Sequence, residues 1–446
     1  MLRNPKTIHT FAVFLRKRDI MLVQFSFSNY KCFKDKATLN LVAKNTKGKE
    51  HYSMATDFNY RVLKSVAVYG ANASGKTKLF TAFKFLKMVI VPPKRDENVS
   101  LYDFWQTQYD AFRLNSQSQN DTSTFEVVFI LDGIQYRYGI ELNKERIVSE
   151  WLYSKDKREV AVFSREEGSV IKINESQIDS NIANTLISAN MIASTSPFLA
   201  VLASFNDSLA KKIVNWFESV RIISANDLSF SETIRNIDQK NSIITFIKAF
   251  DINIEDFMLH EIEFNEIPDK IKKILSKETS TRVYDGVQTA HKVYNELYEK
   301  TYEELFQLEK DESFGTNRLF ALSWLLISSL KEGTVLFIDE IDSGLHPNIV
   351  KAIIDLYYKI DSKAQLIINS QNTTLLNSTD EDGNKLYRKD QIYLVNKNRY
   401  GESTLFPLTD FDGDLRSNIE KIYLDGNLGG VPFINTSSII NMIKNS

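Results

Sequence analysis

The sequence predicts an α/β fold with a mixed sheet, flanking helices, an antiparallel β-subdomain and a compact helical insertion. Two apolar runs, residues 66–69 and 334–338, predict strands covered on both faces, because such strands are almost wholly apolar. Alternating apolar residues over 125–140, broken by an Asp-Gly pair, predict an antiparallel hairpin. Apolar residues then recur at three- and four-residue spacing over 181–256, which indicates helices. No heptad pattern persists, so a long coiled coil is excluded.

Length and composition indicate a folded chain with two or three cores. The chain has 446 residues, of which 43% are hydrophobic and 12% aromatic, and its formal net charge is −2. A single cysteine, Cys32, excludes an intrachain disulfide and fits a reducing compartment. No apolar run is long enough to span a bilayer. We therefore expect a cytoplasmic location.

Residues 70–77 read Gly-Ala-Asn-Ala-Ser-Gly-Lys-Thr, after the first apolar run and before a helical pattern. This spacing is typical of a P-loop, in which backbone N–H groups surround phosphate oxygens. Lys76 would reach the β and γ phosphates, and Thr77 would offer its hydroxyl to Mg²⁺. The sequence therefore predicts a site for ATP and Mg²⁺. The predicted nucleotide-binding residues are Gly70, Asn72, Ala73, Ser74, Gly75, Lys76 and Thr77.

An acidic pair, Asp339 and Glu340, ends the second apolar run. Because α/β folds place ligands at the carboxyl ends of strands, we expect Asp339 to hold Mg²⁺, directly or through water. Glu340 is the candidate catalytic residue that orients or deprotonates the attacking water. An acidic pair that merely ends a buried strand is the alternative, and the P-loop in the same chain disfavours it.

Residues 312–318, Glu-Ser-Phe-Gly-Thr-Asn-Arg, lie between the P-loop and the acidic pair and precede a long apolar run. A serine hydroxyl, a glycine N–H and a helix N-terminus together form an anion site, although an ordinary serine N-cap is the alternative. The order of motifs resembles ABC-class ATPases, in which a Ser-x-Gly turn meets the γ-phosphate bound by the opposite subunit. The resemblance implies that Ser313 and Gly315 match the family's Leu-Ser-Gly-Gly-Gln signature. Glu312 and two other positions depart from it.

Four further stretches resemble the RloA-like ABC-type ATPases of prokaryotic anti-phage operons, relatives of AriA and, more distantly, of RecF and the Rad50/SMC heads. They are residues 23–35, 150–153, 342–347 and 429–434. The resemblance covers the chain from residue 21 onward. It implies that Asn29, Lys31 and Phe33 lie near the base or phosphates. It also identifies residues 342–346 as the D-loop, which contacts the other head.

One position departs from the family in a way that bears on mechanism. Residues 365–370, Gln-Leu-Ile-Ile-Asn-Ser, match the stretch that a switch histidine follows in the family, but Gln371 takes the place of that histidine. A glutamine amide can hydrogen-bond the γ-phosphate or position water, but it cannot carry a proton. We therefore predict slow turnover, with Gln371 as a catalytic residue and nucleotide-dependent closure intact.

The motifs divide the chain into four expected segments. These are a leader over 1–20 without counterpart in the family, an N-terminal half of the ATPase head with the P-loop and β-subdomain over 21–175, a mainly helical lobe over 176–300, and a C-terminal half with the signature, acidic pair, D-loop and switch over 301–446. Gln106 and Gln108 are the Q-loop candidates.

The resemblance implies an ATPase that binds and slowly hydrolyses ATP between two heads of a homodimer, or within a higher oligomer. It would act as sensor or scaffold of an anti-phage system and control a separately encoded effector, an RloB-like protein or a Toprim nuclease. The five histidines show no metal-ligand spacing, and no nuclease-type acidic cluster occurs. Two alternatives stay open: a RecF-like or Rad50-like DNA-repair ATPase, and a nearly inert nucleotide-binding scaffold.

Overall fold

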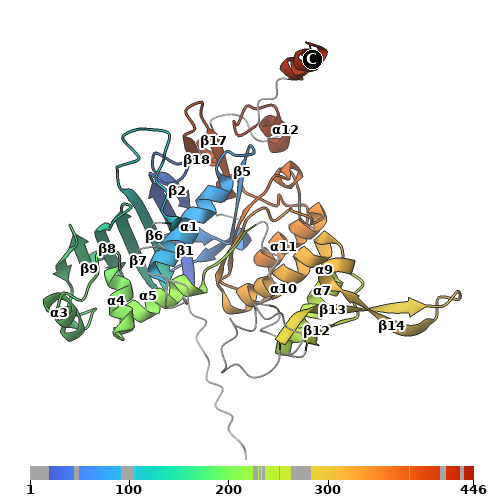
Figure 1. Ribbon diagram of the computed structural model, residues 1–446, viewed down its shortest axis with the longest axis horizontal. Helices are drawn as coiled ribbons and strands as arrows, with labels where there is room; N and C mark the ends of the chain where they lie inside the picture. Colours follow the sequence, from blue (N-terminus) through green and yellow to red (C-terminus); the bar gives the residue numbers. More distant parts are fainter. Residues whose placement is uncertain are drawn as a thin grey trace, which may run out of the picture.

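The structure, a computed structural model, describes residues 20–44, 50–91, 105, 107–224, 230, 233, 237–250, 252–262, 283–380, 382–411, 418–431 and 436–445. Two large sheets form the body of the molecule, and a three-stranded sheet projects from it (Figure 1). A short ribbon pairs β3 (Ser53–Ala55) with β4 (Arg61–Leu63). Among the described helices, none is both long enough and apolar enough to cross a membrane.

The central sheet has six strands in the order β11-β15-β16-β5-β17-β18, and every neighbouring pair is parallel except β17 with β18. The strands are β11 (Arg221–Ile223), β15 (Val335–Ile338), β16 (Gln365–Asn369), β5 (Ser65–Gly70), β17 (Ile392–Lys397) and β18 (Ser403–Pro407). The two predicted apolar runs form β5 and β15. Their residues alternate between two cores: Val66 and Val68 pack in one apolar cluster, and Tyr69 packs in the other. Both faces are therefore covered.

Helices cover the two faces of this sheet. The main ones are α1 (Lys76–Ile90), α10 (Phe314–Glu332) and α11 (Pro347–Lys359). On the α1 side, the rings of Phe80 and Phe83 lie 5.3 and 4.9 Å from that of Phe337 in β15. On the other side, the Tyr357 hydroxyl of α11 donates to Ser329 of α10 at 3.1 Å. Each such buried aromatic side chain stabilises the sheet–helix contact by about 1.5–3 kcal/mol.

The second sheet is antiparallel and has seven strands in the order β10-β9-β8-β7-β6-β1-β2. The strands are β10 (Ser169–Ile173), β9 (Glu159–Glu166), β8 (Ile147–Lys155), β7 (Ile134–Leu142), β6 (Ser123–Leu131), β1 (Ile20–Ser28) and β2 (Ala37–Asn40). β6 and β7 form the predicted hairpin. Its turn residues, Asp132 and Gly133, have φ of 54° and 81°, as a two-residue turn with right-handed strand twist requires. The antiparallel β-subdomain is confirmed.

Residues 176–300 contain helices, as their spacing predicted, together with strands. α3, α4 and α5 pack on the seven-stranded sheet, where the Trp216 ring stacks 4.1 Å from that of Phe129. β11 joins the central sheet, and β12 and β13 belong to the projecting sheet. The elements are α3 (Ser180–Ser188), α4 (Phe198–Ser204), α5 (Ser208–Ser219), α7 (Lys240–Ala249), β12 (Asp256–Ile262), β13 (Val283–Tyr294) and β14 (Lys300–Gln307). The elements of this segment are thus shared among three parts of the fold. The expected segment boundaries stay a prediction.

Short helices lie between and after these elements. They are α9 (Leu308–Asp311), α12 (Ile419–Leu424), α13 (Thr436–Asn445) and the 3₁₀ turns η1 (Glu50–Tyr52), η2 (Ile237–Gln239), η4 (Thr373–Leu376), η5 (Lys389–Gln391) and η6 (Leu408–Asp410). Of the expected leader, only Ile20 is among the described residues, and it begins β1.

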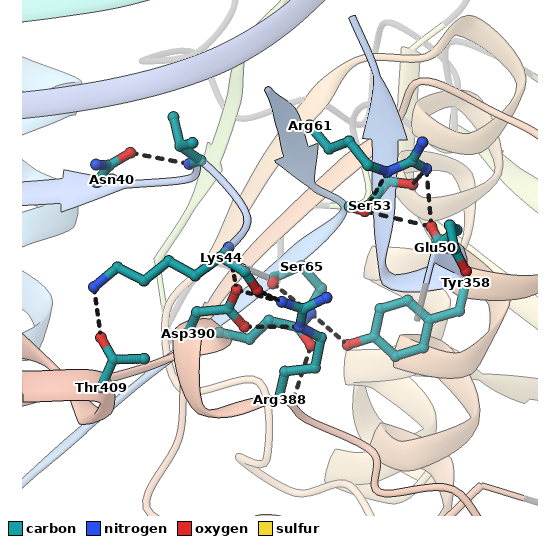
Figure 2. A network of polar contacts seen from close by, with 12 residues as sticks. Asn40, Lys44, Glu50, Ser53, Arg61, Ser65, Tyr358, Arg388, Asp390 and Thr409 are labelled. Atoms are coloured by element: carbon teal, nitrogen blue, oxygen red, sulfur yellow. Dashed lines mark hydrogen bonds and ion pairs between the residues drawn. The ribbon is translucent and has the colours of Figure 1, made fainter. Parts of the chain in front are cut away.

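A network of polar contacts joins early and late parts of the chain (Figure 2). The Lys44 backbone N–H donates to Asp390 Oδ2 at 2.7 Å, and its Nζ donates to Thr409 Oγ1 at 3.0 Å. Arg388 pairs with Asp390 at 2.7 Å and also donates to the Lys44 carbonyl. Charge-assisted bonds of this kind are short and directional. They connect the segment after β2 to the segments before and after β17. Residues far apart in the sequence therefore contribute to the same domain.

Candidate nucleotide site

The P-loop lies where β5 ends and α1 begins. Ala73 and Gly75 have positive φ, 61° and 119°, which folds residues 71–75 into a tight loop. A Cβ on Gly75 would lie 2.7 Å from the Cys32 sulfur, so the backbone conformation and the packing both require glycine. The loop borders a cleft of about 540 Å³. Its lining comprises Cys32, Ala71, Asn72, Ala73, Ser74, Gly75, Lys76, Thr77, Lys78, Glu340, Gln371 and Lys397.

Lys76 lies at the centre of the loop. Its Nζ donates to the carbonyl oxygens of Gly70 and Ala71 at 2.7 and 3.1 Å, and the side chain is buried. Burial lowers the pKa of Lys76, and the nearby Glu340 and Asp339 carboxylates oppose this effect. The two carbonyls hold the ammonium in the loop, and its positive charge can bind an anion at this point.

Thr77 and Asp339 meet at the edge of the cleft. The Thr77 hydroxyl donates to Asp339 Oδ1 at 3.1 Å, and the same carboxylate oxygen accepts from the Asn369 amide. A hydroxyl and a carboxylate side by side are oxygen donors of the kind that Mg²⁺ prefers. The predicted pair therefore comes together, and its chemistry fits the ion.

Glu340 follows Asp339 in a left-handed backbone conformation, with φ of 48°. Its N–H donates to Asn369 Oδ1 at 2.7 Å, which holds this unusual geometry. The Gln371 amide donates to Glu340 Oε1 at 3.2 Å, and the Gln371 N–H donates to Asp342 at 3.1 Å. The two predicted catalytic side chains are thus neighbours on the cleft wall.

Ser313 and Gly315 lie elsewhere. Ser313 caps α10, and its Oγ accepts from the Thr316 N–H at 3.1 Å, so the N-cap interpretation also holds. A Cβ on Gly315 would lie 2.5 Å from the Gly344 carbonyl, which shows how closely the signature turn packs on residues 342–346. Both residues line a separate hollow of about 610 Å³, together with Phe250 and His346, and neither lines the P-loop cleft.

Asn29, Lys31 and Phe33 do not line the P-loop cleft. Asn29 is buried, and its amide donates to three carbonyl oxygens between residues 118 and 122. Lys31 pairs with Asp110 at 2.8 Å, and Phe33 is fully buried beneath Gly75. Each side chain has a partner or packing role in the fold, and the implied approach of the three to base or phosphates stays a prediction.

Four residues near the cleft were not predicted from the sequence as site residues. Cys32 lines it between two residues that the resemblance singled out. The Ser403 hydroxyl donates to the Ser74 carbonyl at 2.5 Å, and Lys397 Nζ donates to the Ala73 carbonyl at 3.1 Å. Asn369 joins both acidic residues. Of the Q-loop candidates, Gln106 lies outside the described residues, and Gln108 is exposed and absent from the cleft lining.

Residues 65–377, more than half of the chain, match the family described as "AAA domain, putative AbiEii toxin, Type IV TA system". The chain belongs to this family. Membership, the strand order and the motif positions together confirm the predicted fold class, a P-loop NTPase head of the ABC type. Among curated proteins, no relative matches the sequence.

Solved structures similar to this AAA domain include heads of SMC proteins. One is the SMC head domain from Thermotoga maritima, at 13% identity and a TM-score of 0.39, covering 87% of this chain and 98% of that one. Another is the Smc head bound to the C-terminal winged-helix domain of ScpA, at 14% identity and a TM-score of 0.42, with the same two coverages. A third is the Smc head with an extended coiled coil bound to the C-terminal domain of ScpA derived from Pyrococcus furiosus, at 14% identity and a TM-score of 0.37, covering 87% and 96%.

Proposed function

We propose that this AAA domain binds ATP with Mg²⁺ in the P-loop cleft and hydrolyses it. The loop supplies N–H groups, and Lys76 supplies a buried positive charge beside them. Thr77 and Asp339 would hold Mg²⁺, which neutralises charge on the β and γ phosphates. Family membership supports nucleotide chemistry at this position.

Glu340 is the proposed residue that orients the attacking water or takes its proton. It lines the same cleft as Lys76, and its carboxylate accepts from the Gln371 amide. Gln371 can fix the direction of that carboxylate, but an amide takes no proton at neutral pH. We therefore propose slow turnover in which Glu340 alone serves as the proton acceptor.

A second copy of the chain completes each site in this proposal. The observation that carries it is the position of Ser313 and Gly315, at the N-terminus of the 19-residue helix α10, in a hollow that contains no P-loop residue. A hydroxyl and N–H groups at a helix N-terminus favour a phosphate. Since the P-loop of the same chain lies in another cleft, the phosphate would come from a partner head.

Mixing two inactive variants tests the composite site. Lys76→Ala removes the phosphate-binding ammonium, and Ser313→Arg fills the signature hollow, so neither variant should hydrolyse ATP alone. A mixed dimer contains one intact P-loop facing one intact signature turn. Recovery of ATPase activity on mixing supports the proposal. A mixture as inactive as its components, formed from variants that each dimerise, refutes it.

We further propose that ATP-driven closure controls a separately encoded effector in an anti-phage system. The resemblance to RloA-like ATPases supports this role, and the family description, which names a toxin–antitoxin system, is in keeping with it. Glu340→Gln should trap the ATP-bound dimer, and the product of the neighbouring gene should co-purify with that state in preference to the ATP-free protein. DNA-stimulated hydrolysis with strongly salt-dependent DNA binding would favour a repair ATPase instead.

A further inference from the structure

β13, β14 and their connecting turn, residues 283–307, form an arm that projects from the head (Figure 1). β12 pairs with β13 only as far as Ala290, so the outer arm is a two-stranded ribbon. Every residue of β14 is exposed. The exposed large apolar side chains of the arm are Tyr294, Leu297, Tyr298, Tyr302, Leu305 and Phe306. Exposed apolar side chains gathered in this way are typical of contact surfaces.

Hydrogen bonds stabilise the tip of the arm, and apolar packing stabilises its base. At the tip, Asn295 Oδ1 accepts from the N–H groups of Leu297 and Glu299 at 3.0 and 2.9 Å. At the base, Val287 is buried in one apolar cluster with Phe320 of α10. The base of the arm therefore shares an apolar core with the helix that carries the signature turn.

Glu312 connects the arm to the signature turn through hydrogen bonds. Its Oε1 accepts from the Thr289 hydroxyl at 2.6 Å and lies 2.6 Å from His291 Nε2. Both partners are on β13, and the residue after Glu312 is Ser313. From the other side, the Asn317 amide donates to the Ser313 carbonyl at 3.1 Å. A leucine, which the family pattern has at position 312, could make neither bond, so the departure of this chain has a structural role.

We propose that Glu312 is a positioning residue through which the arm sets the signature turn. The arm would then control closure of two heads and leave ATP binding by one head unaffected. This inference rests on the proposed function, in which the signature turn acts on the nucleotide of the other copy. Consistent with it, the P-loop cleft is lined by residues 32, 71–78, 340, 371 and 397, and none of them belongs to the arm.

The test measures two quantities in a Glu340→Gln background: ATP affinity of the single head, and ATP-dependent dimerisation by sedimentation. Glu312→Leu removes the acceptor at similar volume and should weaken dimerisation about tenfold or more while ATP affinity stays unchanged. Glu312→Gln keeps an acceptor oxygen and should restore dimerisation. Glu309→Leu, an exposed glutamate on α9, is the matched control and should behave like the parent. Thr289→Val, which is isosteric, provides the same test if Glu312→Leu fails to fold.

The outcomes separate this inference from the function on which it rests. Unchanged dimerisation in both Glu312→Leu and Thr289→Val overturns it. An equal loss of ATP affinity and dimerisation also overturns it, because Glu312 would then only support the fold. If the Glu340→Gln parent forms no ATP-dependent dimer, the composite site itself is refuted and the inference falls with it. Combining Thr289→Val with Glu312→Leu should add nothing to the effect of Glu312→Leu, since Glu312→Leu already removes the Thr289–Glu312 bond.

Discussion

Replacing Asn369 by alanine should abolish most turnover while leaving ATP binding intact. The Asn369 side chain is fully buried at the end of β16, donates to Asp339 and accepts from the Glu340 N–H at 2.7 Å. A bond to a charged group contributes about 1.5–3 kcal/mol and a neutral one about 1 kcal/mol. Glu340 has a φ of 48°, a conformation that costs a non-glycine residue roughly 1–2 kcal/mol and that the Asn369 bond holds in place.

Losing both hydrogen bonds removes about 2.5–4 kcal/mol of interaction free energy that holds the acidic pair in position. If this energy is needed only when Glu340 must be in place for hydrolysis, turnover falls by roughly 70- to 900-fold. Steady-state phosphate release measures turnover, and calorimetric titration with ATP measures binding. Asn372→Ala is the matched control, because Asn372 caps the turn η4 and its side chain accepts hydrogen bonds from Thr374. Turnover of Asn369→Ala within about threefold of the parent, in a protein that still melts cooperatively, would refute the role given to Asn369.

Three further perturbations follow from the geometry. Gln371→His should speed hydrolysis and introduce a dependence on pH near the histidine pKa of about 6.5; an unchanged rate and profile would show that this position is not the switch. Gly75→Ala should abolish ATP binding, since its Cβ would meet the Cys32 sulfur at 2.7 Å, whereas Gly168→Ala, also at positive φ but with open space around it, should bind ATP normally. Burial lowers the pKa of Lys87 to about 8, so the unfolded chain holds this proton more tightly and stability rises from about pH 8 toward pH 10.4. Lys87→Met should flatten that rise in urea unfolding, and an identical pH slope would contradict this reasoning.

The sequence alone locates those parts of the site that consecutive residues form. The P-loop needs its glycines and Lys76 at fixed spacing, and the acidic pair needs an apolar strand before it, so both could be located without coordinates. The hairpin was equally local, because Asp132 and Gly133 adopt the positive φ that its turn demands.

The remaining parts of the site depend on which strands are neighbours. Ser403 and Lys397 reach the P-loop only because β17 lies beside β5 and β18 beside β17, an order that no local pattern encodes. Asn369 belongs to a sequence motif that gives it no role, since its two partners, Asp339 and Glu340, follow a different strand, β15. Asn29 and Phe33 show the reverse case. The resemblance implies a place near the ligand, which stays a prediction, and the structure shows that both side chains are buried in the fold.

The strand order also bears on how the protein is synthesised. β5, wholly buried in the finished sheet, lies between β16 and β17, both of which leave the ribosome about 300 residues later. At roughly 5–20 residues per second, this apolar strand waits for about 15–60 s without its partners. A nascent chain therefore cannot complete the sheet around the P-loop until β16 and β17 have been synthesised. Over that interval, shielding by a chaperone would guard β5 against aggregation.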